Sequence, residues 1–136
     1  MALQFEQETY KIIGVCMKVH RILGAGFLES AYQEALEKEF KSQEIPFIRH
    51  QKLALTYIGE PMKKFFVADF VCFSTIMVEL KSLPFIHKDN FAQLINYLKS
   101  TKLEVGLLVN FGAHLLQYKR CINTTPSNHP NKCNPN

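Results

Sequence analysis

The sequence predicts one α/β domain, or an α+β domain with a mixed sheet, whose elements follow in the order α-α-β-β-β-α-β-β. Three observations predict it. The chain has 136 residues, 47% of them hydrophobic and 21% charged, which is typical of a single globular domain. Apolar residues recur at helical spacing in three segments. Short apolar and β-branched segments, bounded by turn residues, lie between and after those helices.

Two helices are expected at the N-terminal end. Over residues 6–23 the apolar positions share one helix face, and Gly24-Ala25-Gly26 ends the pattern. A second helix is expected from about residue 28 to 43, with these residues on one side: Ala31, Tyr32, Ala35 and Leu36. Glu29 falls on or near the apolar arc of this helix. Stabilisation by the helix dipole at the first turn is the alternative explanation for its place.

Three strands are expected next, as an antiparallel meander. Residues 51–58 form the first, closed by a turn at Gly59-Glu60-Pro61. Residues 64–73 are almost continuously apolar, aromatic or β-branched, which predicts a strand buried on both faces. After Ser74-Thr75, residues 76–82 form the third strand.

The last elements are a helix over about 89–101 and strands over 104–111 and 114–122. The strand–helix–strand unit from 76 to 111 predicts a parallel strand pair. Residues 1–122 then form one domain. The tail 123–136 is rich in Asn and Pro, and we expect it to be disordered.

Several classes of protein are disfavoured by composition. No apolar run approaches the roughly 18 residues of a membrane span, and the N-terminus does not resemble a signal peptide, so we expect a cytoplasmic protein without a membrane partner. The four cysteines lack zinc-ligand spacing, and Cys16 and Cys72 are expected as core thiols. Residues 1–60 carry seven basic and eight acidic side chains, and residues 61–136 carry nine and four. The basic second half is compatible with an anionic partner, although on charge alone a solvated surface is the preferred explanation.

Asp69 interrupts the most apolar strand. It is one of only two aspartates in the chain and stands in the middle of residues 65–73. A carboxylate in apolar surroundings is costly unless a lysine, backbone N–H groups or a metal stabilises it. Taken by itself, a hydrogen-bonded structural aspartate is the simpler explanation.

The following strand adds two charged residues. Alternation places Glu79 and Lys81 on one face of residues 76–82, about 7 Å apart along the strand. With Asp69 they bring two carboxylates and one ammonium to a sheet edge, which suits a hard divalent cation and a phosphate. A buried ion pair without chemistry is the alternative. Without a metal, clustered carboxylates repel each other, and we expect at least one of them to have a raised pKa.

The register of these two strands decides whether the cluster exists. A two-residue turn at Ser74-Thr75 would pair Asp69 with Leu80 and direct its carboxylate to the other face. The metal-site hypothesis therefore predicts a three-residue loop or a bulge, which brings Asp69 opposite Glu79 or Lys81.

Gln93 and Tyr97 are spaced i, i+4 on the helix predicted over 89–101. They lie off its apolar stripe and are placed to line a cleft, where the Gln amide would bind a phosphate, a water or a base. Exposed polar positions on an amphipathic helix are the alternative.

The segment Gly26-Phe27-Leu28-Glu29-Ser30-Ala31-Tyr32 resembles the motif that names the GxxExxY protein family, which is assigned to the PD-(D/E)XK nuclease superfamily. The resemblance extends from about Tyr10 to Ile122. It includes Ala68-Asp69 in place of the Pro-Asp of the superfamily name, together with Glu79-Leu80-Lys81, Gln93, Tyr97 and residues 106–112. It implies a restriction-endonuclease-like α-β-β-β-α-β core with an extra N-terminal helix and an extra C-terminal strand.

The same resemblance implies roles for individual residues. Asp69 and Glu79 would hold Mg²⁺ or Mn²⁺ with the backbone carbonyl of Leu80, and Glu29 would bind the metal directly or through water. Lys81 would orient or deprotonate the attacking water. Gln93 and Tyr97 resemble a Q-x-x-x-Y motif, which implies a catalytic and substrate-binding Gln and a substrate-binding Tyr.

The sequence therefore predicts a metal-dependent nuclease that acts on nucleic acid, DNA in preference to RNA. The basic second half, including Lys63 and Lys64, would follow the nucleic-acid backbone. The alternative is a non-catalytic nucleic-acid-binding or regulatory module on the same fold. Endo or exo action, strand preference and oligomeric state stay open, a homodimer included.

Overall fold

The computed structural model describes residues 5–123 and 132–134. Its elements confirm the predicted order and add one short strand. They are α1 (Glu6–Leu23), α2 (Glu29–Ser42), β1 (Phe47–Tyr57), β2 (Glu60–Cys72), β3 (Ile76–Lys81), α3 (Lys88–Lys99), β4 (Val105–Asn110), β5 (Gln117–Ile122) and β6 (Lys132–Asn134). None of these described helices is both long and apolar enough to cross a membrane.

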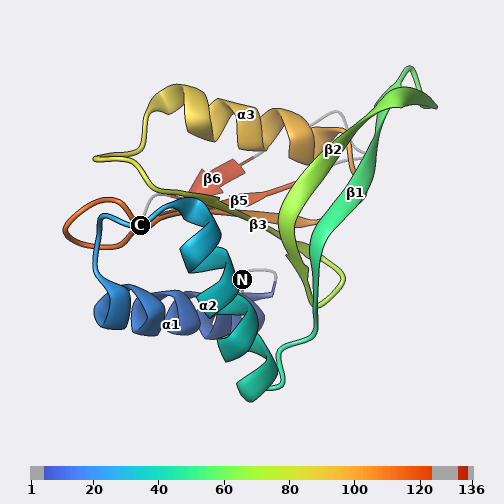
Figure 1. Cartoon of the computed structure of the whole chain (residues 1–136). Coiled ribbons are helices and arrows are strands. Elements are labelled where there is room, and N and C mark those ends of the chain that lie inside the picture. The colour runs from blue at the N-terminus through green and yellow to red at the C-terminus, as the bar shows by residue number, and fades with distance from the viewer. Residues whose placement is uncertain (1–4, 124–131, 135–136) are drawn as a thin grey trace.

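One mixed sheet in the order β1-β2-β3-β4-β5-β6 forms the middle layer. The pair β3–β4, joined through α3, is parallel, as the strand–helix–strand pattern predicts, and the other pairs are antiparallel. Helices α1 and α2 cover one face of the sheet and α3 covers the other (Figure 1). The fold is thus a three-layer sandwich with mixed strand directions.

Each face of the sheet has its own apolar core. Leu36 and Phe40 of α2 pack with Val78 and Leu80 of β3 in the larger cluster. Met77 of β3 packs in the smaller cluster, with Leu94 and Leu98 of α3. Because side chains alternate along a strand, Glu79 and Lys81 share the α3 face with Met77. The expected alternation of β3 is therefore confirmed.

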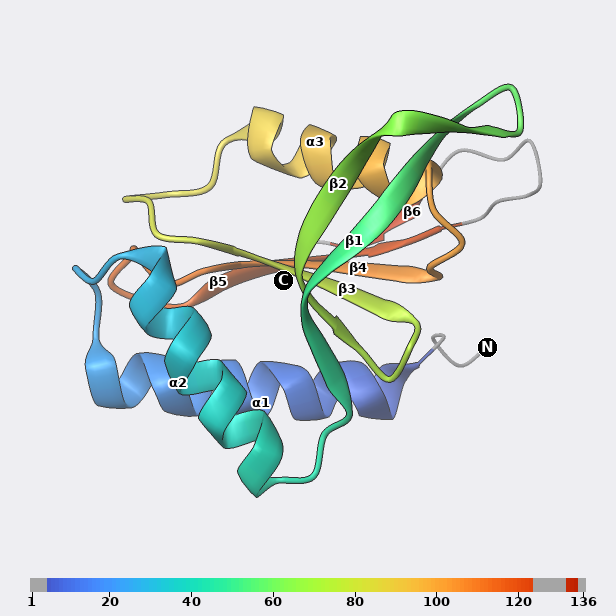
Figure 2. The ribbon, with the colours of Figure 1, turned by 45° about the vertical axis from the view of Figure 1, so that its right-hand side comes forward.

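The first hairpin differs from the prediction. Its strands are longer and meet at a two-residue turn, Ile58-Gly59, where both residues have positive φ (49° and 77°), as type I′ hairpin turns require. The outer half of this ribbon projects from the sheet (Figure 2). Phe65 and Val67 are accordingly 47% and 43% exposed, although the sequence predicted burial of 64–73 on both faces. That prediction is wrong for the outer half, where only Phe66 and Ala68 are buried, in the α3-side core, and right for residues 70–72.

The buried thiols and the C-terminal segment complete the fold. Cys16 and Cys72 are core residues as predicted, and burial raises the pKa of the Cys72 thiol to about 12. Asn123 is also buried, with Nδ2 donating to the carbonyl oxygens of Leu98 (2.8 Å) and Leu103 (2.9 Å). Strand β6 pairs with β5. The prediction of a disordered tail over 123–136 is thus wrong for these residues, and the rest of the tail lies outside the described residues.

Candidate active site

The β2–β3 register places Asp69 and Glu79 side by side. Cys72 pairs with Ile76 and Phe70 with Val78, so the loop between the strands has three residues, 73–75. Continued by one residue, this register sets Asp69 opposite Glu79. The three-residue loop predicted from the metal-site hypothesis is therefore confirmed. A two-residue turn would have separated the two carboxylates to opposite faces.

Asp69 stands where β2 leaves the sheet. Phe66 and Ala68 pack in the α3-side core, whereas Phe70 packs in the α1–α2 core, so the alternation of faces breaks at Asp69. In β1, His50 stands opposite this break and has a positive φ of 55°. The strand is therefore kinked at Asp69.

The Asp69 carboxylate replaces strand pairing at the kink. Its Oδ2 accepts a hydrogen bond of 2.8 Å from the backbone N–H of Leu80, in β3 beyond the last β2 pair. The carbonyl of a strand residue points to the same side as its N–H. The Leu80 carbonyl, expected from the resemblance as a metal ligand, therefore faces this same edge.

Gln33 of α2 holds the other oxygen of Asp69 and was not anticipated from the sequence. Its Nε2 donates to Asp69 Oδ1 at 3.0 Å. Its Oε1 accepts from Arg49 Nη2 at 3.2 Å and lies 2.9 Å from His50 Nε2, which donates to it in the Nε2–H tautomer. Arg49 in turn forms an ion pair with Glu37 at 3.0 Å. Gln33 is thus fixed from both ends. The available signal was its position four residues after Glu29, on the same helix face.

Glu79 is the most perturbed acid of the site. Burial first, and then the charge of Asp69 and a hydrogen bond with it, raise the pKa of Glu79 to about 10 from an ordinary 4.5, against the opposing effect of Lys81. Its Oε1 is buried and has no hydrogen-bond partner among the described residues. The expectation that at least one clustered carboxylate has a raised pKa is confirmed. This raised pKa favours the protonated form of Glu79 at neutral pH when no metal is bound.

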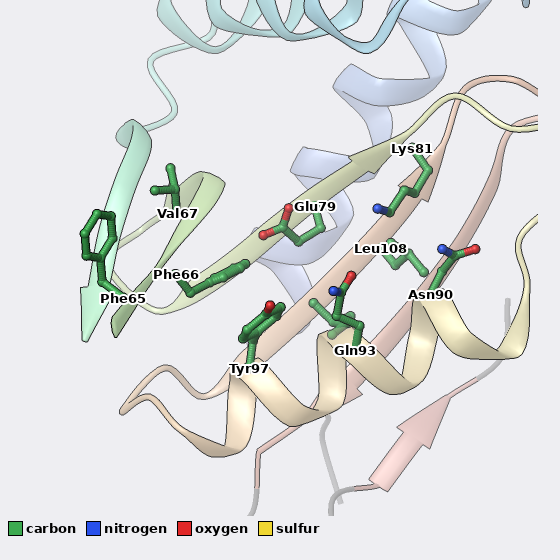
Figure 3. A pocket seen from close by; sticks show the side chains of 10 residues that line it. Phe65, Phe66, Val67, Glu79, Lys81, Asn90, Gln93, Tyr97 and Leu108 are labelled. Atoms are coloured by element: carbon green, nitrogen blue, oxygen red, sulfur yellow. The ribbon is translucent and has the colours of Figure 1, made fainter. Parts of the chain in front are cut away.

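Lys81 and Glu29 complete the charged cluster. The side chain of Lys81 lies on the same face of β3 as Glu79, and its ammonium points along the strand toward that residue (Figure 3). Lys81 forms no ion pair within the described part of the chain. Burial raises the pKa of Glu29, while the charge of Lys81 lowers it and the charge of Asp69 raises it. Glu29 therefore interacts electrostatically with the cluster from the first turn of α2.

Tyr32 fixes the position of the first turn of α2, which carries Glu29. Its hydroxyl donates to the carbonyl of Gly24 and accepts from the N–H of Phe27, and its ring stacks on Phe111 at 4.6 Å. These contacts tie the loop before α2 to the core. The Tyr of the Gly26-to-Tyr32 motif thus has a structural role, which is to place Glu29 at the sheet.

A cavity of about 270 Å³ opens on the α3 side of Glu79 and Lys81. Gln93 and Tyr97 of α3 line it, as their spacing predicts (Figure 3). Lys63 and Lys64 do not reach it. They are exposed on the outer half of β2, in the projecting ribbon.

The donor set fits a divalent cation held partly by substrate. Within the residues that the structure describes, no group of three His, Cys, Asp or Glu side chains is placed to hold a metal ion. Asp69 and Glu79 nevertheless offer two adjacent carboxylates, one with a buried unpaired oxygen. Mg²⁺ is usually bound through only one or two carboxylates, with waters and phosphate oxygens as its other ligands.

Comparison with known families identifies the superfamily of the chain. A model described as the PD-(D/E)XK nuclease superfamily matches residues 6–121. The chain therefore belongs to the PD-(D/E)XK nuclease superfamily, and its mixed α/β architecture is consistent with a restriction-endonuclease-like fold. Comparisons with curated proteins and with solved structures gave no match.

Proposed function

We propose that the chain is a metal-dependent nuclease that hydrolyses phosphodiester bonds in nucleic acid, with DNA favoured over RNA. Membership of the superfamily supports nuclease chemistry. The observation that carries the proposal is the buried side chain of Glu79 beside Asp69, whose Oε1 has no hydrogen-bond partner among the described residues, with Lys81 directed at it. A buried carboxylate with an unpaired oxygen is costly unless a cation compensates it. We also propose membership of the GxxExxY family, on the Gly26-to-Tyr32 motif.

The residues that would hold the metal follow from the geometry. Asp69 and Glu79 would supply carboxylate oxygens and Leu80 its backbone carbonyl, while Glu29 would act through water, since no third acidic side chain joins the described cluster closely. When bound, Mg²⁺ or Mn²⁺ supplies positive charge next to the phosphate and favours ionisation of water. Glu79 must release its proton to become a ligand, and Gln33 keeps Asp69 turned toward β3.

Lys81 acts on the reacting groups, and Gln93 acts on the bound substrate. The Lys81 ammonium orients the attacking water and stabilises the charge that develops on the phosphate. Gln93, exposed on α3 at the cavity, binds the substrate through its side-chain amide. Lys63 and Lys64 contact the nucleic-acid backbone away from the site, which makes binding sensitive to salt.

The test is metal-dependent cleavage of linear and circular DNA. The wild-type protein should cleave with Mg²⁺ or Mn²⁺ and stop when a chelator is added. Asp69→Asn should be inactive and Lys81→Met should cleave on the order of 10²-fold more slowly under the same conditions. Lys38→Met, which changes an exposed lysine on α2, serves as the matched control and should cleave normally. A wild-type protein that binds DNA but never cleaves it with any divalent metal would instead be a non-catalytic binding module.

A further inference from the structure

The cavity beside Glu79 and Lys81 has an aromatic end that the nuclease chemistry does not use. The ring of Phe66, from β2, stacks on the ring of Tyr97, from α3, with centroids 3.9 Å apart and planes at 28° (Figure 3). Both residues line the cavity that holds Glu79 and Lys81. Because the two rings cover each other's inner faces, the pair offers an outer aromatic face and ring edges at one end of a cavity that also holds Glu79 and Lys81. Such surfaces bind flat rings by stacking.

The α3 wall of the same cavity carries two primary amides. Gln93 is exposed, and no hydrogen bond ties its side chain to another described residue. The Oδ1 of Asn90 accepts a hydrogen bond of 3.0 Å from the backbone N–H of His87, and the side-chain amino group of Asn90 takes no part in this bond. A primary amide both donates and accepts, which is what the edge of a nucleobase requires. Stacking surface and amide groups thus lie within one cavity.

The size of the cavity limits what can enter it. At about 270 Å³ it lies just below the usual range for small-molecule sites. A single base can enter, with its phosphate toward Lys81, and a base that stacks on Tyr97 has lost its neighbouring base on that face. A base that enters must therefore be unpaired, and extracting one from a duplex costs unstacking and unpairing energy.

We propose that this cavity receives one unpaired nucleotide, whose base stacks on the Phe66–Tyr97 pair and whose edge meets Gln93 and Asn90. The substrate class is then single-stranded nucleic acid or a frayed end, in preference to an intact duplex. This inference rests on the proposed nuclease function and narrows it. Exposed Phe65 also lines the cavity, and Lys52 Nζ lies 4.9 Å from its ring centroid, which adds an aromatic and basic surface at the cavity rim.

Binding without metal tests the inference separately from cleavage. The probes are a short single-stranded DNA, the duplex of the same sequence, and an abasic strand of equal length and charge that lacks every base. The affinity of each is measured by fluorescence anisotropy in a chelator. Wild-type protein should bind the intact strand roughly tenfold more tightly than the abasic strand, since one stacked base contributes this much. It should also prefer the intact strand to the duplex.

Two variants locate the effect. Tyr97→Leu removes the ring and should bring the ratio of intact to abasic affinity close to one. Gln93→Ala should also lower the ratio of intact to abasic affinity. Because it changes an exposed helix position that tolerates Ala, this variant keeps the test valid if Tyr97→Leu does not fold. Asn96→Ala, exposed on α3 and absent from the cavity lining, is the matched control and should keep the wild-type ratio.

Two results would overturn the inference. One is equal affinity of the wild-type protein for the intact strand and for either the abasic strand or the duplex. The other is an unchanged ratio in Gln93→Ala and in folded Tyr97→Leu. If metal-dependent cleavage of duplex DNA persists in either case, the nuclease proposal stands and only the unpaired-nucleotide site is wrong. A protein that binds none of the three probes contradicts the inference as well.

Discussion

Replacing Glu79 by Gln should remove a specific pH dependence of stability. The pKa of Glu79 is about 10 in the folded protein, against 4.5 as its ordinary value. Between these two values the folded state holds one proton more than the unfolded state. The stabilisation that Glu79 gains from this proton is complete below its ordinary pKa and is lost as the pH rises toward the folded pKa.

The magnitude follows from the linkage relation. One extra bound proton lowers the free energy of unfolding by about 1.4 kcal/mol for each unit of rising pH. From pH 6 to pH 8 the loss is about 3 kcal/mol, a large share of the roughly 5–15 kcal/mol that stabilises a domain. Gln does not titrate, so the variant Glu79→Gln should not lose this stability. Between pH 6 and pH 8 its free energy of unfolding should therefore rise by this amount relative to that of the wild type.

Urea denaturation in a chelator at pH 6, 7 and 8 measures the effect. At each pH the free energy of unfolding of the wild type is subtracted from that of the variant. This subtraction cancels the contribution of groups that titrate in both proteins, Glu29 among them. Glu60→Gln, an exposed carboxylate on the projecting ribbon, is the matched control and should leave the slope unchanged. Parallel pH curves for wild type and Glu79→Gln would show that Glu79 is ionised in the fold and would refute the reasoning.

The remaining predictions concern the other residues of the site. Mn²⁺ or Mg²⁺ should raise the melting temperature of the wild type but not of Asp69→Asn, because only the folded wild type binds the ion; equal shifts would contradict this. Lys81→Met should lower the saturated cleavage rate on the order of 10²-fold with DNA affinity nearly intact, as kinetics and anisotropy would show. Gln33→Leu should weaken Mn²⁺ binding by about 10- to 100-fold in calorimetry, since it releases Asp69; an unchanged affinity would refute the positioning role. Lys63→Ala and Lys64→Ala should each flatten the salt dependence of DNA binding and leave the saturated rate unchanged, and a slower saturated rate would place these lysines in the chemistry.

The sequence anticipated the charged pair on β3 because strand alternation has a fixed period of two. It also anticipated the loop length, because only one register brings Asp69 to Glu79. Gln33 was missed because a single Gln on an amphipathic helix gives no signal until its partner across the fold is known. The exposure of Phe65 was missed for a related reason. An apolar strand does not reveal how much of its length lies between two helical layers.

Turns at a protein surface usually tolerate the gain or loss of a residue. The turn over residues 73–75 does not have this freedom. If β3 shifts by one position against β2 to absorb a deletion, Cys72 pairs with Met77 and Asp69 stands opposite Leu80, whose side chain belongs to the α1–α2 core. After such a shift the chain can still fold, but the carboxylates of Asp69 and Glu79 no longer lie side by side. The length of this turn is therefore constrained by chemistry that occurs elsewhere, and insertions or deletions should be tolerated at the Ile58-Gly59 turn but not here.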